Sequence, residues 1–480
     1  MTQLSPAGGI ALAFGLAVAL ATFTQCGDGR AAAPPTDPQD PAPAPARLPP
    51  PPDAVRILIS GSMLGHLEPC GCASGQLGGL ARRVQHIGEQ RTYDLLIEGG
   101  DVAGGDTELD ALKLFTALTV LVQMANYDAL GVGATDLTVP RDEWKAFLAG
   151  APVVATNLTC GEPDWPGKAF VEKTVRTHTV RIGSLLLDAL PTALTAPDAP
   201  VARTDPAAAW HAAFGDAPAA TLRIALLQGS DAAIRELLPQ LDPAPDLAVG
   251  VDQNYIEPTA APAMVGKVPL VFAGIRGREL LDTRLWRDGA MPRVACEVVP
   301  LAGSRTVPGG GGDPQVRDVL LEHRRTVKEA GVLANLANRH PTPNGAAYVG
   351  TALCQGCHQA AYDVWTKSKH GHAWQTLVDA EKDPKRYGWP VTAYPDCVGC
   401  HTVGYGQKTG FQSFEATPQL ANVGCERCHG PGSAHVAAAG KVKLGIIGGI
   451  AASVLCTQCH DYEQSPTFVY GDRWKLIEHK

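Results

Sequence analysis

The sequence predicts a multidomain protein in which an α/β domain is followed by a mostly helical, loop-rich domain. Between residues 54 and 304, short apolar runs such as AVRILIS (54–60) and YDLLIEGG (93–100) alternate with helix-compatible segments, which is typical of α/β proteins. After about residue 346 these runs stop, and Cys, His, Gly and Pro punctuate short helical stretches. The 480 residues, 45% of them hydrophobic, are enough for two or three domains with real cores.

Two segments precede the α/β domain. Residues 1–25 contain an apolar stretch that is shorter than the roughly 20 residues that span a bilayer, which predicts an export signal or a short membrane anchor. Residues 26–53 are rich in Pro and Ala and predict a stiff linker. Cys26 stands where bacterial lipoproteins carry a lipidated cysteine, so lipid attachment is an open alternative. We therefore expect an exported protein, periplasmic or at the cell surface.

A connector joins the two predicted domains. Residues 305–345 begin with a glycine-rich stretch and continue in a predicted helix over 316–335. The loop-rich domain is then expected over 346–480. The net charge of −8 comes from the residues before 346, because 346–480 holds 12 Lys and Arg against 11 Asp and Glu. Nothing in this distribution indicates a nucleic-acid partner.

Four C-x-x-C-H motifs mark the loop-rich domain, at 354–358, 397–401, 425–429 and 456–460. A C-x-x-C pair by itself could hold zinc, form a redox disulfide or receive a covalent haem. The histidine after each pair favours haem, because both cysteines form thioether bonds and the next residue reaches the iron. Zinc sites do not need that histidine. The sequence thus predicts four c-type haems.

The residues of these sites follow from the spacing. The predicted attachment residues are Cys354, Cys357, Cys397, Cys400, Cys425, Cys428, Cys456 and Cys459, and the predicted proximal iron ligands are His358, His401, His429 and His460.

Further histidines are candidates for the opposite face of each iron. A second histidine gives a six-coordinate electron carrier, whereas an open face can bind a small molecule. The candidates are His370, His372, His435 and His479, with His340 and His323 behind them. His370 and His372 are two residues apart, so on a helix they point to different sides and suit two different haems. Four candidates for four irons favour fully ligated haems.

The stretches YVGTALCQGCHQAAYDVWTKSKHGHAW, YPDCVGCHTVGYGQKTGF, NVGCERCHGPGSAH and CTQCHDYEQSPTFVYGDRWKLIEH resemble the tetrahaem cytochromes related to the electron acceptor of hydroxylamine oxidoreductase. The resemblance covers nearly all of 347–480. It implies a mostly helical fold whose closely stacked haems pass electrons one at a time. It also implies distal ligands at His370 or His372 or both, at His435 and at His479. One haem of the best-known family member lacks a protein sixth ligand.

A second resemblance, over 54–304, is to the 5′-nucleotidase branch of the calcineurin-like metallophosphatases. Its framework includes RILISGSMLGHL, LLIEGGDVAGG, NYDALGVGATDL and VPLVFAGIRGRELLDTRL. Those enzymes hold two metal ions, but only Asp101 of that metal set remains. The other ligand positions are occupied by Ser62 and Leu64, Gly133 to Asp136, Gln228 and Gly229, and Val251 to Asn254. A lone carboxylate cannot hold two divalent ions, so we expect no phosphatase activity and no second metal.

A C-x-C pair, Cys70 and Cys72, lies just after the first predicted strand of this domain. Three interpretations stay open. These cysteines could form structural disulfides with Cys160 and Cys296. They could form a redox-active disulfide that exchanges electrons with the haems, or a thiolate metal site with His66. Asp101 would belong to such a site or be a turn-forming residue.

Together these observations predict an exported electron-transfer protein rather than an enzyme, with redox proteins as partners. The α/β domain would serve for docking or redox contact. One alternative is a redox enzyme that acts on a small nitrogen or sulfur compound at an open haem. The other is a metal-dependent phosphoesterase with an attached cytochrome.

Overall fold

The computed structural model describes residues 49–69, 77–90, 92–139, 150–161, 165–194, 201–254, 256–303, 311–383, 389–445, 451–461, 464–465 and 467–479. Pro49–Lys480 forms one compact unit. We refer to residues 54–303 as the α/β part and to residues 346–479 as the C-terminal segment. Within the described ranges, every helix is too short or too polar to cross a bilayer.

Two six-stranded sheets form the frame of the α/β part, together with a small pair, β5 (Leu158–Cys160) and β8 (Val201–Arg203). In both sheets the central strands are parallel and antiparallel strands lie at an edge. The first sheet has the order β14 (Met291–Pro300), β13 (Glu279–Asp288), β1 (Val55–Ser60), β2 (Leu95–Glu98), β3 (Ala129–Gly131) and β4 (Val153–Val154). The second has the order β11 (Ala263–Val265), β12 (Val268–Phe272), β10 (Leu247–Val251), β9 (Leu222–Gln228), β7 (His178–Leu186) and β6 (Val171–Val175).

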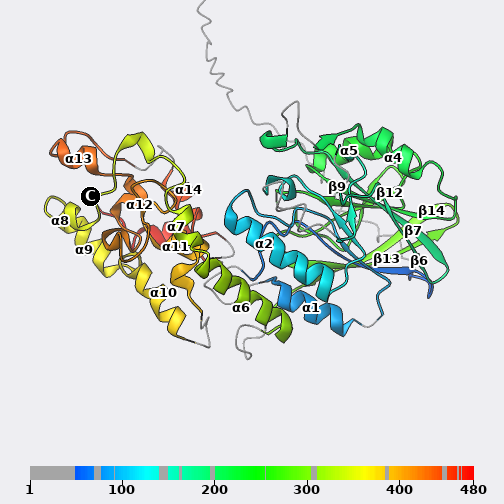
Figure 1. Ribbon diagram of the computed structural model, residues 1–480, viewed down its shortest axis with the longest axis horizontal. Helices are drawn as coiled ribbons and strands as arrows, with labels where there is room; N and C mark the ends of the chain where they lie inside the picture. The colour runs from blue at the N-terminus through cyan, green and yellow to red at the C-terminus, as the bar shows by residue number, and fades with distance from the viewer. Residues whose placement is uncertain are drawn as a thin grey trace, which may run out of the picture. The chain divides into compact units, whose positions relative to one another are not determined.

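The sheets pack face to face and helices cover their outer sides. Ile57 and Ile97 of the first sheet share one apolar cluster with Ile224 and Val249 of the second. Figure 1 shows α1 (Leu80–Glu89) and α2 (Glu108–Leu118) on one side of the strands, and α4 (Pro206–Phe214) and α5 (Asp231–Leu237) on the other. Because the central strands are buried on both faces, they are mostly apolar; in β9 all seven residues are buried and five of them are apolar. The predicted α/β sandwich is confirmed.

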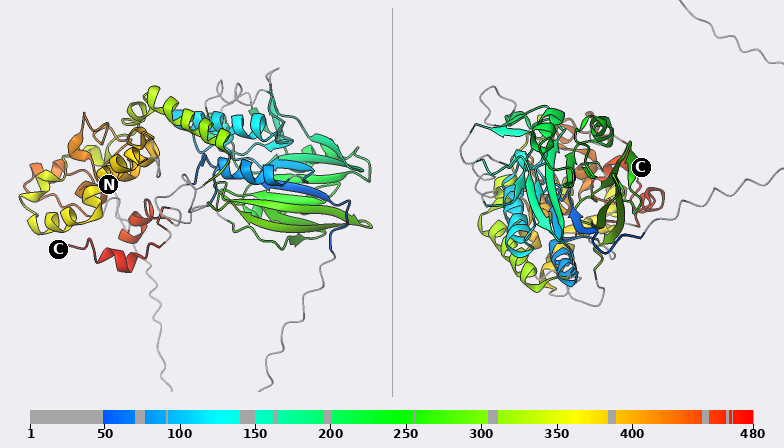
Figure 2. Two further views of the ribbon diagram at one scale, coloured as in Figure 1. Left: turned by 90° about the horizontal axis from the view of Figure 1, so that it is seen from below. Right: turned by 90° about the vertical axis from the view of Figure 1, so that its right-hand side faces the viewer.

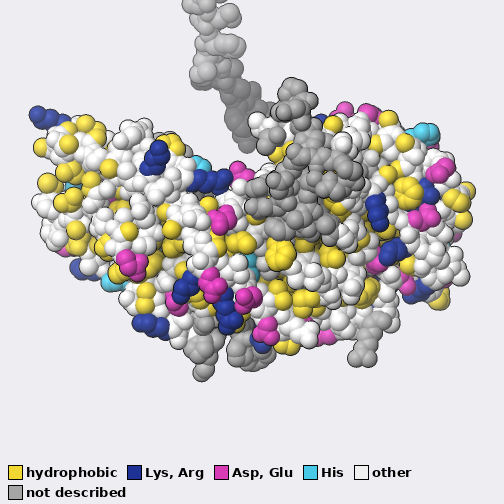
Figure 3. Space-filling model, viewed as in Figure 1, with side chains coloured by type: hydrophobic (Ala, Val, Ile, Leu, Met, Phe, Trp, Pro, Cys, Tyr) yellow, Lys and Arg dark blue, Asp and Glu magenta, His cyan; other side chains and the backbone are white. Residues whose placement is uncertain are grey.

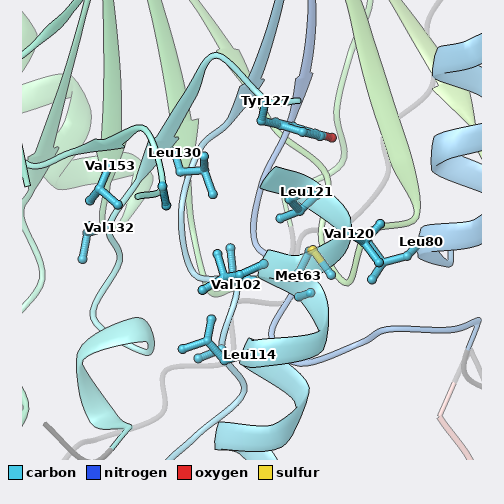
Figure 4. Packing of buried hydrophobic residues seen from close by; sticks show 14 of the residues in the cluster. Met63, Leu80, Val102, Leu114, Val120, Leu121, Tyr127, Leu130, Val132 and Val153 are labelled. Carbon is cyan, nitrogen blue, oxygen red and sulfur yellow. The ribbon is translucent and has the colours of Figure 1, made fainter. Parts of the chain in front are cut away.

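The packing under α1 and α2 brings the loop after β1 into the core. Figure 4 shows Met63 of this loop among Leu80 of α1, Leu114 of α2 and Leu121 of the π-helical turn that follows α2 (Thr119–Met124). A capping box holds the start of α2, where the side chains of Thr107 and Asp110 each accept a hydrogen bond from the other's backbone N–H. The loop end of the sandwich is therefore anchored by buried side chains.

The connector forms two helices where the sequence predicts one. They are α6 (Pro314–Glu329) and α7 (Val332–Leu336). Gly331 lies between them with φ 68°, a left-handed conformation that ends α6 and that glycine adopts without steric cost. Val316 and Leu320 of α6 pack in the cluster under α1 and α2, and Figure 2 shows α6 lying beside α2.

The C-terminal segment is built from short helices and irregular chain, as predicted. Its longest described helix, α10, has ten residues, and a single larger apolar cluster forms around Trp374, Val398 and Phe411. The α-helices are α8 (Ala352–Gln355), α9 (Gln359–Lys367), α10 (Ala373–Lys382), α11 (Pro395–His401), α12 (Cys425–His429), α13 (Ser433–Ala437), α14 (Ala452–Thr457) and α15 (Tyr470–Trp474).

Candidate haem sites and the loop end of the sandwich

Each of the four C-x-x-C-H motifs forms or closes a short helical turn. In the first motif the His358 N–H donates to the Cys354 carbonyl at 2.9 Å, and in the fourth His460 donates to Cys456 at 2.8 Å. Helices α11 and α12 end on the histidine of the second and third motifs. Residues i, i+3 and i+4 of a helical turn lie on one face, so both cysteines and the histidine can approach the same group from one side.

Three of the four motif histidines face a second histidine. The ring centres are 6.0 Å apart for His358 and His435, 6.0 Å for His370 and His460, and 5.9 Å for His429 and His479. Two metal–nitrogen bonds of about 2 Å each, together with the two ring radii, give a separation of about 6 Å. Each pair therefore has the spacing that a metal ion bound between two imidazoles requires.

Hydrogen bonds at Nδ1 leave Nε2 available in three of these six rings. Nδ1 lies 2.6 Å from the Val442 carbonyl oxygen in His435, 3.2 Å from that of Gly445 in His429, and 2.8 Å from that of Ile477 in His479. A carbonyl can only accept, so Nδ1 carries the proton and the neutral ring presents an unprotonated Nε2. This second contact is the usual way in which a protein orients a metal-binding histidine.

His401 and His372 differ from the paired histidines. His401 has the same Nδ1 arrangement, 2.7 Å from the Ala373 carbonyl oxygen, but among the described residues no second histidine ring faces it. His372 has its Nε2 3.0 Å from the Thr366 carbonyl oxygen, so this nitrogen is a donor, and among the described residues its ring faces no motif histidine. Of the two neighbouring candidates, His370 is thus the one with ligand geometry.

The other two histidines considered from the sequence have different surroundings. His323 is buried between the hydroxyl groups of Thr116, 2.9 Å from Nδ1, and Tyr394, 3.1 Å from Nε2. His340 is exposed, and its backbone forms a β-bridge with Gln407. Neither ring faces a motif histidine.

The four motifs lie next to one another in a definite order. The thiols of Cys354 and Cys425 are within hydrogen-bonding reach, which places the first motif beside the third. Cys400 and Cys459 have the same relation, which places the second motif beside the fourth. Arg427 links these two motif pairs, because its Nη2 lies 3.6 Å from the Cys459 sulfur. The spatial order is therefore first, third, fourth and second.

Glu426 organises the third motif, a role that was not predicted from the sequence. Its side chain is 2% exposed and accepts hydrogen bonds from the backbone N–H groups of Val349, Gly350 and Gly432 at 2.7–3.1 Å. One carboxylate thereby joins the chain at 349–350 to the loop that follows the third motif. The charged residue in the middle of C-E-R-C-H was the signal that could have pointed to it.

At the loop end of the sandwich, Asp101 and Asp136 form a buried acidic pair. Asp136 accepts hydrogen bonds from the N–H groups of Asp101, Ala103 and Gly133 at 2.8–2.9 Å. Thr135 donates from both its N–H and its hydroxyl to Oδ1 of Asp101, at 3.0 and 2.7 Å. Burial, then the charge of Asp101, raises the pKa of Asp136 to about 7, and burial also raises the pKa of Asp101.

The loops around this pair have unusual backbone conformations. Ser62, Leu64 and Asp101 have φ values of 52°, 49° and 54°, in the left-handed region that non-glycine residues seldom adopt. Their N–H and C=O groups interlock, since Ser62 donates to Gly100 and Leu64 donates to Asp101, both at 2.9 Å. The surrounding core thus holds these loops in a strained arrangement.

The cysteine candidates of the α/β part are only partly visible. Cys70, Cys72 and Cys26 lie outside the described residues. Cys160 is in β5 and Cys296 is buried in β14, where the Thr283 hydroxyl is 3.6 Å from its sulfur. The Nδ1 atom of His66 is 2.9 Å from the Leu64 carbonyl oxygen. Over the described residues, no three His, Cys, Asp or Glu side chains gather as a group that could hold a metal ion.

The region that contains the first three motifs is similar to known cytochromes. Residues 353–430 match the family of cytochrome c554 and c-prime. Cytochrome c-554 of Nitrosomonas europaea is 37% identical over 109 residues, which cover 22% of this chain and 46% of that protein. The chain thus spans about half the length of this curated relative. The predicted resemblance to this cytochrome family is confirmed for the matched residues, and a match to a c-type cytochrome family supports covalently bound haem there.

Solved structures that resemble the chain include the sulfate thiohydrolase SoxB of Thermus thermophilus, with a TM-score of 0.48 and 14% identity over 58% of this chain and 62% of that one. A 5′-nucleotidase precursor from Thermus thermophilus has a TM-score of 0.45 and 17% identity over 60% and 64%. At these identities the likeness concerns the fold only, and no activity follows from it.

Proposed function

We propose that this protein is an exported tetrahaem c-type cytochrome that transfers electrons between redox proteins. The main support is the geometry of the histidines: three facing pairs, 5.9–6.0 Å apart, in which three of the rings donate from Nδ1 to a carbonyl and so leave Nε2 for a metal. Such donor sets beside C-x-x-C-H motifs fit iron held in a porphyrin. Bound haem would supply one-electron iron chemistry at each motif.

Each haem would be held by the two cysteines and the histidine of its motif. In this proposal His435 opposes His358, His370 opposes His460, and His479 opposes His429. His401 would ligate the fourth iron from one side. In this proposal electrons pass from haem to haem in the spatial order of the motifs, which is first, third, fourth and second, with short steps between neighbours.

A spectrum and an intact mass test the proposal together. Protein expressed in a host that attaches c-type haem should have the mass of the chain plus four haems. Its reduced-minus-oxidised spectrum should show mainly six-coordinate iron. His479→Ala should convert one haem from low to high spin, because it removes the ring 5.9 Å from His429. His372→Ala is the matched control and should leave the spectrum unchanged. Colourless protein, or zinc at the thiol pairs, would contradict the proposal.

The α/β part is proposed as a non-catalytic docking or redox-contact domain. Of the metal ligands expected from the family resemblance, Asp101 remains, and its carboxylate is engaged by Thr135. A metal-dependent assay with a nucleotide and a chromogenic phosphodiester should therefore be silent. Turnover that disappears in Asp101→Ala would instead show a working hydrolase.

A second candidate function is redox chemistry on a small nitrogen or sulfur compound at the second motif. The observation that favours it is the difference between His401 and the three paired histidines. Carbon monoxide binding to the reduced protein is the measurement, because six-coordinate haems resist this ligand. Binding at one of four haems would support the second candidate, and complete resistance would leave electron transfer alone.

A further inference from the structure

Two aspartates of the C-terminal segment directly flank C-x-x-C-H motifs and each meets a cation of the α/β part. Asp396 precedes Cys397, and its Oδ2 is 2.6 Å from Nζ of Lys113 in α2. Asp461 follows His460, and its Oδ2 is 3.5 Å from Nη1 of Arg276, in the loop after β12. Two basic residues that are 163 positions apart in the sequence thus each contact an aspartate that is adjacent to a motif.

These two motifs are themselves neighbours. Cys400 of the second motif is within hydrogen-bonding reach of Cys459 of the fourth, so both ion pairs lie at the same motif pair. The first and third motifs differ from these two. There the negative charge of Glu426 is compensated by backbone N–H groups of the C-terminal segment itself. External positive charge therefore reaches one end of the motif array only, as far as the described residues show.

The contact at Lys113 is held by a buried polar chain. The Thr116 hydroxyl donates to the Leu112 carbonyl at 2.8 Å, so His323 donates to Thr116 from Nδ1. Burial, then the charge of Lys113, lowers the pKa of His323 to about 4, so the imidazole is neutral and its Nε2 accepts the Tyr394 hydroxyl proton. Tyr394 precedes α11, so the chain fixes the start of the second motif against α2.

Lys113 and Asp396 are both charged in this arrangement. The Lys113 side chain is 11% exposed and that of Asp396 is 52% exposed. Burial favours the neutral form of each, but the partner's charge outweighs it, which raises the pKa of Lys113 and lowers the pKa of Asp396. The Arg276–Asp461 pair is more open, with 35% and 38% exposure, and solvent screens it more strongly.

Arg276 belongs to the loop end that carries Asp101. Its backbone N–H donates to the Ser62 carbonyl at 2.6 Å, and its φ is 57°. The conformation of this loop is thus coupled to the strained loop after β1. The same end of the sandwich that holds the acidic pair supplies a charge to the fourth motif.

We infer that Lys113 and Arg276 set the reduction potentials of the haem pair at the second and fourth motifs, so that the α/β part acts as an electrostatic cap on one end of the haem array. This inference rests on the proposed tetrahaem function. Reduction lowers the positive charge on iron by one, so an uncompensated aspartate beside a haem favours the oxidised state and a paired one does not. The cap makes the second and fourth haems better electron acceptors than they would be alone, and electrons from a reduced partner protein collect there.

Spectroelectrochemical titration of the four haems tests the inference. Lys113→Met should leave Asp396 uncompensated and lower one midpoint potential, whereas Asp396→Asn should leave Lys113 uncompensated and raise it. Each change should alter the reduced-to-oxidised ratio at a fixed potential by about tenfold, which is about 59 mV for one electron. Lys113→Arg keeps the positive charge and should retain the wild-type midpoint potential. A purely structural role of the pair would move both variants in the same direction.

Controls separate this inference from the proposed function. Lys173→Met removes a cation that is paired with Asp128 at 3.0 Å on the α/β part, and should shift no haem. Arg276→Gln and Asp461→Asn provide a second pair with opposite but smaller shifts if a Lys113 variant fails to fold. Four haems with unchanged potentials in all variants would overturn the inference alone. Protein without haem in the wild type would instead overturn the proposed function.

Discussion

The α/β part and the C-terminal segment obtain their cores in different ways. The sandwich has three apolar clusters made of its own strands and helices, with Val316 and Leu320 of the connector helix α6 added to one of them. The C-terminal segment has short helices and leaves large apolar side chains exposed, such as Leu353 at 59% and Leu476 at 63%. Seven of the nine most exposed large apolar residues among those described belong to it: Leu353, Phe414, Val436, Val442, Val454, Val469 and Leu476. Figure 3 shows apolar side chains across the visible face.

This difference indicates what completes each core. Side chains alone bury enough apolar surface in the sandwich, because the two sheets and their covering helices provide continuous layers. In the C-terminal segment the short helices instead leave large apolar side chains exposed. Covalently attached porphyrin would supply the missing apolar surface, so folding of this segment should depend on it.

Removing one attachment site should have the largest effect. Cys425→Ser with Cys428→Ser should remove one haem and leave the C-terminal segment open to proteolysis, while the α/β part stays resistant. Intact mass and limited proteolysis measure both results. Cys296→Ala, in buried β14, is the matched control and should cost about 1 kcal/mol of stability without loss of haem. Equal protease resistance in both variants would show that the segment folds without its third haem.

A smaller loss of stability is expected when the buried carboxylate of the third motif is removed. Glu426→Ala leaves the N–H groups of Val349, Gly350 and Gly432 without their acceptor, which should destabilise the haem-loaded protein by about 3 kcal/mol. Denaturant unfolding followed by haem absorbance measures the change. Glu415→Ala, at an exposed position of the same segment, should have an effect below about 0.5 kcal/mol. A similar midpoint for both variants would contradict the role given to Glu426.

The smallest change within any one pH unit concerns the acidic pair of the α/β part. With its pKa raised to about 7, Asp136 keeps a proton in the folded state that the unfolded chain has released above about pH 4. Stability should therefore fall as pH rises from about 4 to about 7, by up to about 1.4 kcal/mol per pH unit. Asp101→Asn removes the neighbouring charge, lowers the pKa of Asp136 and should flatten this dependence.

Thermal unfolding of the α/β transition at several pH values measures that slope. Asp231→Asn, at an exposed position of α5, is the control and should retain the wild-type slope. An unchanged slope in Asp101→Asn would mean that the two buried carboxylates are not coupled.

Local patterns let the sequence predict the fold class and the motif residues. Apolar strands such as β9 and the five-residue C-x-x-C-H spacing are contained in short stretches, so composition and spacing reveal them without knowledge of the fold. The break of the connector at Gly331 was missed, because a single glycine within a helical pattern does not say whether its backbone turns left-handed. The roles of Cys70 and Cys72 stay predictions.

Only the tertiary structure decided which of these residues meet. His358 and His435 are far apart in the chain, as are Lys113 and Asp396, and loops of that length permit many partners. The choice between His370 and His372 depended on which ring nitrogen was already occupied by a backbone carbonyl. The physical reason is that spacing along the chain determines which residues can share one helical turn, whereas contacts between distant turns depend on how all the elements pack.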